Sequence, residues 1–299
     1  MKKFLWKVFL FLLIFVMIDQ IAGVFFQMVS DSIHIGGTGR DNYICNAVKD
    51  DILIFGSSRA ESHYNAQLIT DSLGVTAYNC GESGNGVILN YGRLLMILER
   101  HTPKCIIYDV MPDFDYLMGE DNHKYLYRLK PHYYRKGIKG IFDDVDIKEK
   151  YKMLSGLYRF NSSFFQNLLV FITGISTDSG VRGFRPMKGE LDPLKVADDG
   201  MNYDGFICDS LKINYIQEFI NKTKASDVLF VVSPLWYGQD TSVFQPIKDL
   251  CKKNNIRFVD FSNDDKYVHN DSLFKNGQHL NAKGADVFSK EIVELLKGR

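Results

Sequence analysis

The chain has 299 residues, and its 36 basic and 36 acidic residues balance to a net charge of zero. That length can bury a sizeable core, and an aromatic content of 13% excludes a disordered polymer. The charge balance gives no indication of a nucleic-acid partner. The five cysteines include no CxxC pair and show no zinc-ligand spacing, so we expect no metal site and no cofactor.

The N-terminal segment 1–29 has the composition of a membrane anchor. Three lysines in the first seven residues precede an apolar run that continues, with one acidic interruption, through Val29. The run reaches the ~20 residues that a spanning helix needs, and the ~2.5–3.5 kcal/mol cost of Asp19 at mid-membrane is outweighed by its neighbours. We therefore predict a single-pass anchor, with the lysines cytoplasmic and the rest of the chain extracytoplasmic.

A cleavable signal peptide is the alternative for this segment, with small residues at Ala22 and Gly23 as a cleavage site. The apolar stretch that continues beyond them favours retention. Residues 30–50 are polar and contain glycines, and we interpret them as a linker to the first strand.

From residue 51 onward, short apolar runs alternate with helical periodicity. We expect strands at 52–55, 75–79, 105–110, 228–233 and 256–261, and helices at 63–73, 87–100, 243–254 and 282–297. This alternation predicts an α/β fold, a three-layer α/β/α sandwich with a five-stranded parallel sheet of flavodoxin-like type. Functional sites in such folds lie at the carboxyl ends of the strands.

The third and fourth expected strands are separated by residues 111–227, too many for one crossover. We interpret this segment as an insertion into a domain that spans 51–299, and as a candidate substrate-selecting subdomain. Its apolar stretch FFQNLLVFI (164–172) is too short for a second membrane span.

The first expected strand ends in Gly56-Ser57-Ser58, directly before a helical segment. Glycine and serine are common turn formers, so a structural explanation exists. The alternative is that Ser58 is a nucleophile, because the unpaired backbone N–H groups at a helix start can stabilise the oxyanion of acyl transfer. A serine hydroxyl also needs a base.

The other end of the chain offers that base. His279 follows the last expected strand and precedes the closing helix, which Asn281 can cap. Because the carboxyl ends of parallel strands share one edge of the sheet, we expect His279 and Ser58 to lie at the same edge.

These motifs, in this order, resemble the SGNH (GDSL-type) hydrolase family in its membrane-anchored bacterial form. The first block is matched by Gly56-Ser57-Ser58, the second by YNCGESGNG (78–86), and the last by Asn276-Gly277-Gln278-His279. The resemblance covers 51–113 and 228–297. It implies that Ser58 is the nucleophile and His279 the base, and that backbone N–H groups of Ser58 and Gly84 form the oxyanion hole, with Gly81 as an alternative to Gly84.

Two positions depart from the family pattern. The third block should carry an oxyanion-hole asparagine, but Asp113 stands nearest, and an ionised carboxylate cannot donate a hydrogen bond. Asn85 or Asn79 could replace it. The family's aspartate beside the histidine is Asn276 here. Its carbonyl oxygen can orient an imidazole, as in Cys-His-Asn sites, and Asp271 or a backbone carbonyl could do the same.

Four residues near the expected edge are candidates for substrate binding: Arg59, Asn85, Asp113 and Trp236. Arg59 would either steer an anionic substrate or face solvent. Trp236 would either stack on a sugar ring or pack in the core.

The predicted function is an extracytoplasmic serine esterase or O-acyltransferase of SGNH type. It would act through an acyl-Ser58 intermediate on acyl, chiefly acetyl, esters of cell-surface or exported glycans. This substrate class rests on the resemblance and the location. The alternative is a catalytically weak SGNH-fold protein that serves as a glycan-binding or assembly module. A hydrogen bond between Ser58 and His279 favours the enzyme, and a His279 turned away favours the module.

Overall fold

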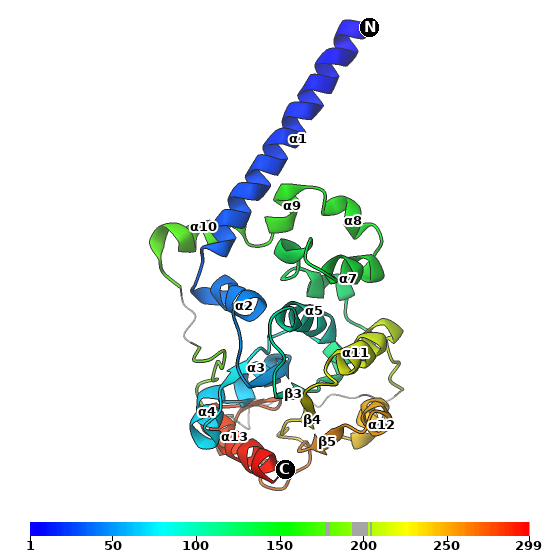
Figure 1. Cartoon of the computed structure of the whole chain (residues 1–299). Coiled ribbons are helices and arrows are strands. Elements are labelled where there is room, and N and C mark those ends of the chain that lie inside the picture. Colours follow the sequence, from blue (N-terminus) through cyan, green and yellow to red (C-terminus); the bar gives the residue numbers. More distant parts are fainter. Residues whose placement is uncertain (177–179, 193–202, 204, 299) are drawn as a thin grey trace. The chain divides into compact units, whose positions relative to one another are not determined.

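The computed structural model describes residues 1–176, 180–192, 203 and 205–298 (Figure 1). The chain forms two compact units: unit 1 comprises Met1–Ala47 and Asn122–Asp178, and unit 2 comprises Val48–Asp121 and Ser179–Arg299. The insertion predicted at 111–227 therefore contributes to both units, and part of it lies outside the described residues.

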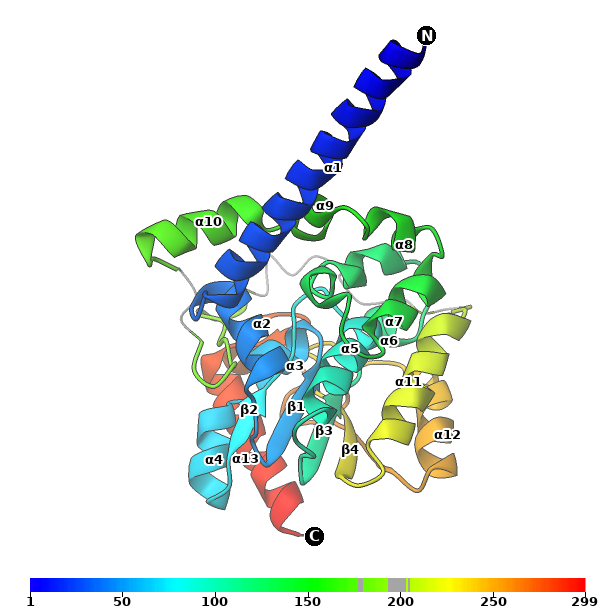
Figure 2. The same ribbon diagram turned by 45° about the horizontal axis from the view of Figure 1, so that its top comes forward.

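The centre of unit 2 is the predicted five-stranded sheet (Figure 2). Its strands are β1 (Ile52–Gly56), β2 (Ala77–Asn79), β3 (Cys105–Asp109), β4 (Asp227–Val232) and β5 (Arg257–Asp260). The spatial order is β2-β1-β3-β4-β5, and every neighbouring pair is parallel. The α/β class with an all-parallel five-stranded sheet is thus confirmed.

Helices cover both faces of this sheet. They are α3 (Ser58–His63), α4 (Ala66–Leu73), α5 (Val87–Leu98), α6 (Pro112–Asp115), α11 (Ser210–Lys222), α12 (Gln245–Lys253) and α13 (Ala282–Lys297). The helices α4 and α13 pack together on one face, and α5 and α11 pack together on the other. The single helix expected at 63–73 is two helices, because Asn65 caps a new helix by accepting a hydrogen bond from the Leu68 N–H.

Side chains of the central strands are buried on both faces, which explains why their sequences are continuously apolar. Ile52 and Ile54 point into the core beneath α4 and α13, whereas Phe55 packs edge-on against Phe219 of α11. All five cysteines are free, and Cys80 and Cys105 are buried as expected of small apolar side chains.

A short antiparallel hairpin follows β5 and the 3₁₀ turn η5 (Asp271–Leu273). It consists of β6 (Phe274–Asn276) and β7 (His279–Leu280). The hairpin leads directly into α13, so the predicted last motif lies on a two-stranded ribbon and not on a loop.

Unit 1 is helical. It contains α1 (Lys2–Asp31), α2 (Gly36–Asn46), α7 (Ile138–Val145), α8 (Glu149–Lys152), α9 (Gly156–Phe160) and α10 (Phe164–Thr173), with 3₁₀ turns η1 (Asn122–Leu126) and η2 (Lys130–His132). Within the described residues, α1 is the helix long and apolar enough to cross a membrane, with a mean hydropathy of 2.5, although a signal sequence has the same character.

The segment 30–50, predicted to be a linker, is largely helical. Its glycines disfavour a helix locally, but α2 gains tertiary partners that the sequence pattern does not display. Asp41 pairs with Arg128 at 2.7 Å, and Arg135 donates to the Cys45 carbonyl at 2.9 Å. These long-range contacts within unit 1 stabilise α2.

The membrane-type helix α1 contacts α9 closely. The Asp19 carboxylate accepts hydrogen bonds from the Ser155 hydroxyl at 2.6 Å and the Gly156 N–H at 2.7 Å, and so caps the start of α9. A Cβ atom on Gly23 would lie 2.5 Å from the Gly156 Cα. Glycine at both positions therefore lets the two backbones touch.

Candidate active site

Ser58 is the first residue of α3 and directly follows the carboxyl end of β1. The turn requires glycine at position 56, because its φ is +140° and a Cβ there would lie 2.6 Å from the Asp109 carbonyl oxygen. As the first residue of a helix, Ser58 keeps a backbone N–H that has no acceptor within the helix.

The hydroxyl of Ser58 meets the imidazole of His279. The His279 Nε2 lies 2.8 Å from the Ser58 Oγ, although the two residues are 221 positions apart in the chain. This is the distance at which a general base can take a proton from a serine hydroxyl.

Asn276 holds the other side of the same imidazole. Its Oδ1 accepts hydrogen bonds from the backbone N–H groups of Gln278 at 3.0 Å and His279 at 2.9 Å, and lies 3.0 Å from the His279 Nδ1. Because two N–H donors require an oxygen at that position, the Nδ1 must carry the proton. The Nε2 is then free to accept the Ser58 proton.

The pKa of His279 is lowered to about 4, first by burial and second by the positive charge of Arg59. His279 is therefore neutral at neutral pH, which is the state a general base requires. An asparagine at position 276 adds no negative charge that would raise this pKa.

Arg59 is not a solvent-facing or substrate-steering residue, contrary to both predictions. Its side chain is 1% exposed, with Nε 3.6 Å from the Asp109 Oδ1, and it donates a hydrogen bond to the Val110 carbonyl. The buried Asp109 carboxylate compensates its charge beneath the site, so Arg59 cannot reach a substrate.

His63, one turn after Arg59, supports the strand that carries His279. Its Nε2 accepts a hydrogen bond from the Leu280 N–H at 3.0 Å, so its Nδ1 carries the proton and donates to the Ser233 Oγ at 3.0 Å. Burial holds the pKa of His63 well below its usual value, and electrostatic interactions with the His279 ring and with Arg59 lower it further. His63 is thus neutral and buried, and its hydrogen bond to Leu280 holds strand β7 in position.

The loop after β2 presents Gly84 with a φ of +71°, and a Cβ there would meet open space. Within the described part of the chain, the Gly84 N–H has no hydrogen-bond acceptor. Gly81, the alternative donor, is excluded because its N–H donates to the Asn79 Oδ1 at 2.9 Å. Asn79 is also excluded as an oxyanion donor, because its amide N–H groups donate to the Ala60 and Tyr64 carbonyls.

Charged side chains hold this loop in place from both ends. Arg93 of α5 pairs with Glu82 at 2.7 Å and donates to the Cys80 carbonyl at 2.8 Å. Glu61 of α3 accepts from the Ser83 hydroxyl and pairs with Arg185 at 2.6 Å. The loop carrying Gly84 is therefore fixed to the same helix that carries Ser58.

The structure places the remaining candidates as follows. Asn85 is buried, with its Nδ2 donating to the Ser83 carbonyl at 3.0 Å, and its Oδ1 has no partner within the described residues. Asp113 accepts a hydrogen bond from the Tyr203 hydroxyl at 2.9 Å, consistent with a carboxylate that cannot serve as an oxyanion donor.

Trp236 packs against the core, and its indole N–H donates to Asp271 at 2.8 Å. The indole is thus committed to protein contacts, which supports its packing role over sugar stacking. The same contact excludes Asp271 as the partner of the His279 Nδ1, a position that Asn276 occupies.

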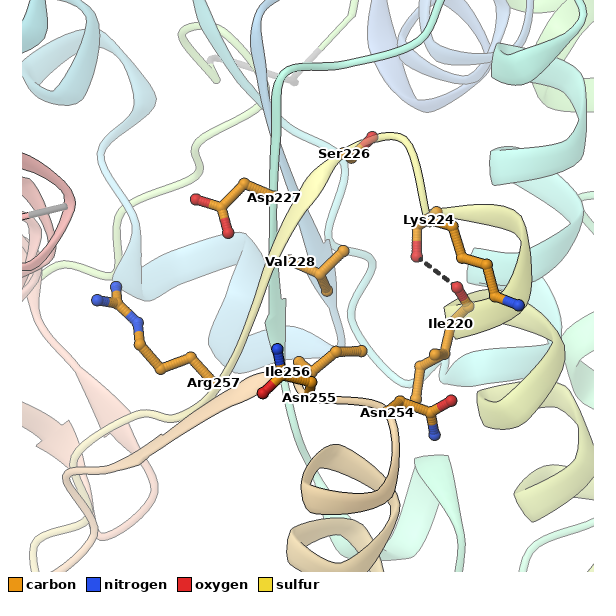
Figure 3. A pocket seen from close by; sticks show the side chains of 10 residues that line it. Ile220, Lys224, Ser226, Asp227, Val228, Asn254, Asn255, Ile256 and Arg257 are labelled. Carbon is orange, nitrogen blue, oxygen red and sulfur yellow. Dashed lines mark hydrogen bonds between the residues drawn. The ribbon is translucent and has the colours of Figure 1, made fainter.

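A pocket of about 380 Å³ lies elsewhere in unit 2 (Figure 3). It is lined by residues at the amino ends of the strands, including Asp227 of β4 and Arg257 of β5. Ser58 and His279 lie at the carboxyl edge, so this pocket is not part of the candidate active site.

One group of metal-type ligands occurs among the described residues, and it lies in unit 1. The His123 Nε2 lies 3.4 Å from Asp146 and 3.9 Å from Glu149. Glu149 already pairs with Lys152, so we interpret the group as an ion-pair cluster.

Asp109, Ser233 and Glu61, which form the supporting network, are not among the predicted site residues. Asp109 ends β3 and Ser233 follows β4, so the rule that sites lie at the carboxyl ends of strands could have identified both. Nothing in the local sequence around Glu61 indicates its contacts with Ser83 and Arg185.

Comparison with known proteins yields no matching family model and no matching curated protein. Among solved structures, a chain from Streptococcus pneumonia provisionally described as a platelet activating factor aligns over 97% of this chain and 98% of its own length. The identity is 14% and the TM-score 0.41. A similarity of this degree defines neither a family nor a function.

Proposed function

We propose that this chain is a serine enzyme of the SGNH type that cleaves or transfers acyl groups through an acyl-Ser58 intermediate. The observation that carries the proposal is the hydrogen-bonded series Ser58–His279–Asn276 at the carboxyl edge of the parallel sheet. A nucleophile, a base and a group that orients the base are the minimum for this chemistry.

In the proposed reaction, the Ser58 Oγ attacks the acyl carbonyl carbon while its proton moves to the His279 Nε2. The oxyanion that forms accepts hydrogen bonds from the Ser58 and Gly84 N–H groups. Collapse of the tetrahedral intermediate expels the alcohol, which takes the proton from His279. Water or a sugar hydroxyl then attacks the acyl carbon while its proton moves to the His279 Nε2. The bond between the acyl carbon and the Ser58 Oγ breaks, Ser58 takes the proton from His279, and the free acid or the acylated sugar is released.

Location and substrate form part of the same proposal. We assign α1 as a retained membrane anchor and the C-terminal part as extracytoplasmic. The contacts of α1 with α9 support retention, because cleavage near Ala22 and Gly23 would remove Asp19 from the α9 cap. The proposed substrates are acyl, chiefly acetyl, esters of cell-surface or exported glycans. Insertion residues near the site, such as Arg185 beside Glu61, are candidates for substrate selection.

A His279 turned away from Ser58 would favour the binding-module alternative, and the 2.8 Å contact favours the enzyme instead. A fluorophosphonate probe, which labels activated serines, tests the two. We expect labelling of the full chain that is lost in Ser58→Ala and retained in Ser57→Ala. Ser57 is a matched control because its buried Oγ makes no hydrogen bond within the described residues. An unlabelled wild type would contradict the proposal.

Hydrolysis and transfer are separated by adding an acceptor. With p-nitrophenyl acetate as donor, a transferase releases p-nitrophenol faster when a sugar acceptor is present and yields the O-acetyl sugar. A hydrolase yields acetate at a rate that the sugar does not change.

A further inference from the structure

The helix α10 in unit 1 is polar inside and apolar outside, the inverse of a helix in a soluble protein. Its buried residue is Asn167, whose Oδ1 accepts a hydrogen bond from the Thr38 hydroxyl of α2 at 2.7 Å. Phe165 and Ile172 are 75% and 71% exposed. In water such a helix would bury its apolar side chains instead.

These side chains form part of a larger surface. We define the α9–α10 apolar surface as the exposed side chains of Leu154, Leu157, Phe165, Leu169, Phe171 and Ile172. Exposed tyrosines accompany it, each beside a cation: Tyr151 lies beneath Lys150, and Tyr134 beneath Arg159. Apolar side chains with tyrosines and basic residues are the composition of a membrane interface.

The point at which α10 contacts α1 is where a membrane interface is expected. Phe26 of α1 packs edge-on against Phe164 of α10, with ring centroids 5.3 Å apart. At 1.5 Å per residue, Phe26 lies about 33 Å along the helix from Phe4, close to the ~30 Å thickness of the hydrocarbon core. If the N-terminal lysines lie at one membrane face, α10 meets α1 at the other.

Asp19 lies about 10 Å deeper along α1 at the same rise per residue. A carboxylate at that depth needs hydrogen-bond donors, and the start of α9 supplies them through the Ser155 hydroxyl and the N–H groups of Gly156 and Leu157. The contact thus explains how α1 tolerates an acidic residue and requires the start of α9 to enter the lipid.

We infer that the α9–α10 apolar surface is embedded in the outer leaflet of the membrane that α1 spans, so that unit 1 binds lipid beside its anchor. The α9–α10 apolar surface contacts the bilayer at the boundary between lipid headgroups and acyl chains. It is continuous with the exposed apolar side chains of α1. The inference requires α1 to be membrane-spanning but does not depend on catalysis.

Tryptophan quenching by brominated lipid tests this inference in the full chain. We would place Ile172→Trp in a Trp6→Phe background, reconstitute one copy per nanodisc, and compare lipids with and without brominated acyl chains. The matched control is Tyr43→Trp on α2 of the same unit, a side chain that is 40% exposed and follows the end of α1. Phe165→Trp is a second, independent position on the surface.

Bromolipid should quench roughly half or more of the added emission at positions 172 and 165, and little at position 43. Emission at 172 and 165 that bromolipid does not quench would overturn the inference, and would indicate a protein occupant if it were also blue-shifted. Equal quenching at position 43 would also overturn it, because the quenching would then report tethering alone.

Discussion

The Nε2 of His279 lies 2.8 Å from the Oγ of Ser58, while the Nδ1 of the same ring faces the Asn276 carbonyl oxygen. An asparagine can therefore set the tautomer that an aspartate sets in other triads, provided that backbone N–H groups fix its orientation. It cannot supply the negative charge that stabilises the imidazolium.

This difference predicts an unusual pH dependence. The pKa of His279 is lowered to about 4, so kcat/KM for p-nitrophenyl acetate should be flat between about pH 5 and pH 8 and fall only as His279 is protonated. Asn276→Asp should move this fall to higher pH and speed fluorophosphonate labelling at neutral pH. Asn276→Ala should lower the rate by ~10²–10⁴, because the tautomer is no longer held. An unchanged pH profile in Asn276→Asp would contradict the assignment.

The proposed role of the Gly84 N–H in the oxyanion hole can be distinguished from the effect of strain at a glycine with positive φ. Gly84 and Gly74 have φ values of +71° and +68°, and open space surrounds the Cβ position of both. Alanine at either position should cost a similar ~1 kcal/mol of stability, measured by urea unfolding. Only Gly84→Ala should also slow labelling of Ser58, because the strained loop would displace the proposed oxyanion donor. Equal labelling in the two variants would argue against Gly84.

His63 should act as a positioning residue. His63→Ala leaves the Leu280 N–H and the Ser233 hydroxyl without this partner, so we expect kcat to fall at least tenfold with little change in KM, because His279 loses its support. Ser233→Ala, which removes one of the two contacts, should have a smaller effect. A change confined to KM would contradict a positioning role.

The lowered pKa of His63 also links stability to pH. Its folded-state pKa lies below that of the unfolded chain, so protonation favours unfolding. The stability it contributes is present above about pH 6.5, the unfolded value, and is lost as pH falls below it. Thermal unfolding of His63→Gln should therefore depend less on pH in the acidic range than that of the wild type.

The buried Arg59 should affect both stability and the pKa of His279. Arg59→Met leaves the Asp109 carboxylate buried without its cation, which typically costs about 3–5 kcal/mol. Loss of the positive charge should also raise the pKa of His279 and move the acid limb of kcat/KM to higher pH. Arg185→Met should cost less, because the Arg185 side chain is 28% exposed and the Glu61 carboxylate keeps its hydrogen bond from the Ser83 hydroxyl. Arg59→Met with Asp109→Leu should recover part of the lost stability.

Asp19 should stabilise α9. Asp19→Ala removes the acceptor for the first N–H groups of α9, and loss of such a cap costs about 1 kcal/mol. Amide hydrogen exchange at Gly156 and Leu157 in nanodiscs should accelerate about fivefold. Asp31→Ala, at the end of the same helix, is the control and should leave these amides unchanged. Unchanged exchange in Asp19→Ala would exclude the cap.

The sequence alone determined the sheet and the two ends of the candidate site. Short apolar runs such as 52–55 and 228–233 predict strands buried on both faces, and alternation with helices predicts a parallel sheet. Because parallel strands share one carboxyl edge, Ser58 and His279 could be placed together across 221 residues.

Only the tertiary structure decided which polar groups are available at that edge. Arg59 has the local sequence of an exposed helix residue and is buried because Asp109 lies on the neighbouring strand. The Gly81 N–H donates to the Asn79 Oδ1, and the Asn79 amide donates to the Ala60 and Tyr64 carbonyls, which leaves Gly84. Likewise, the glycine-rich segment at 36–46 becomes helical through contacts with Arg128 and Arg135. Local patterns report burial and periodicity, whereas hydrogen-bond partners distant in sequence are set only by packing.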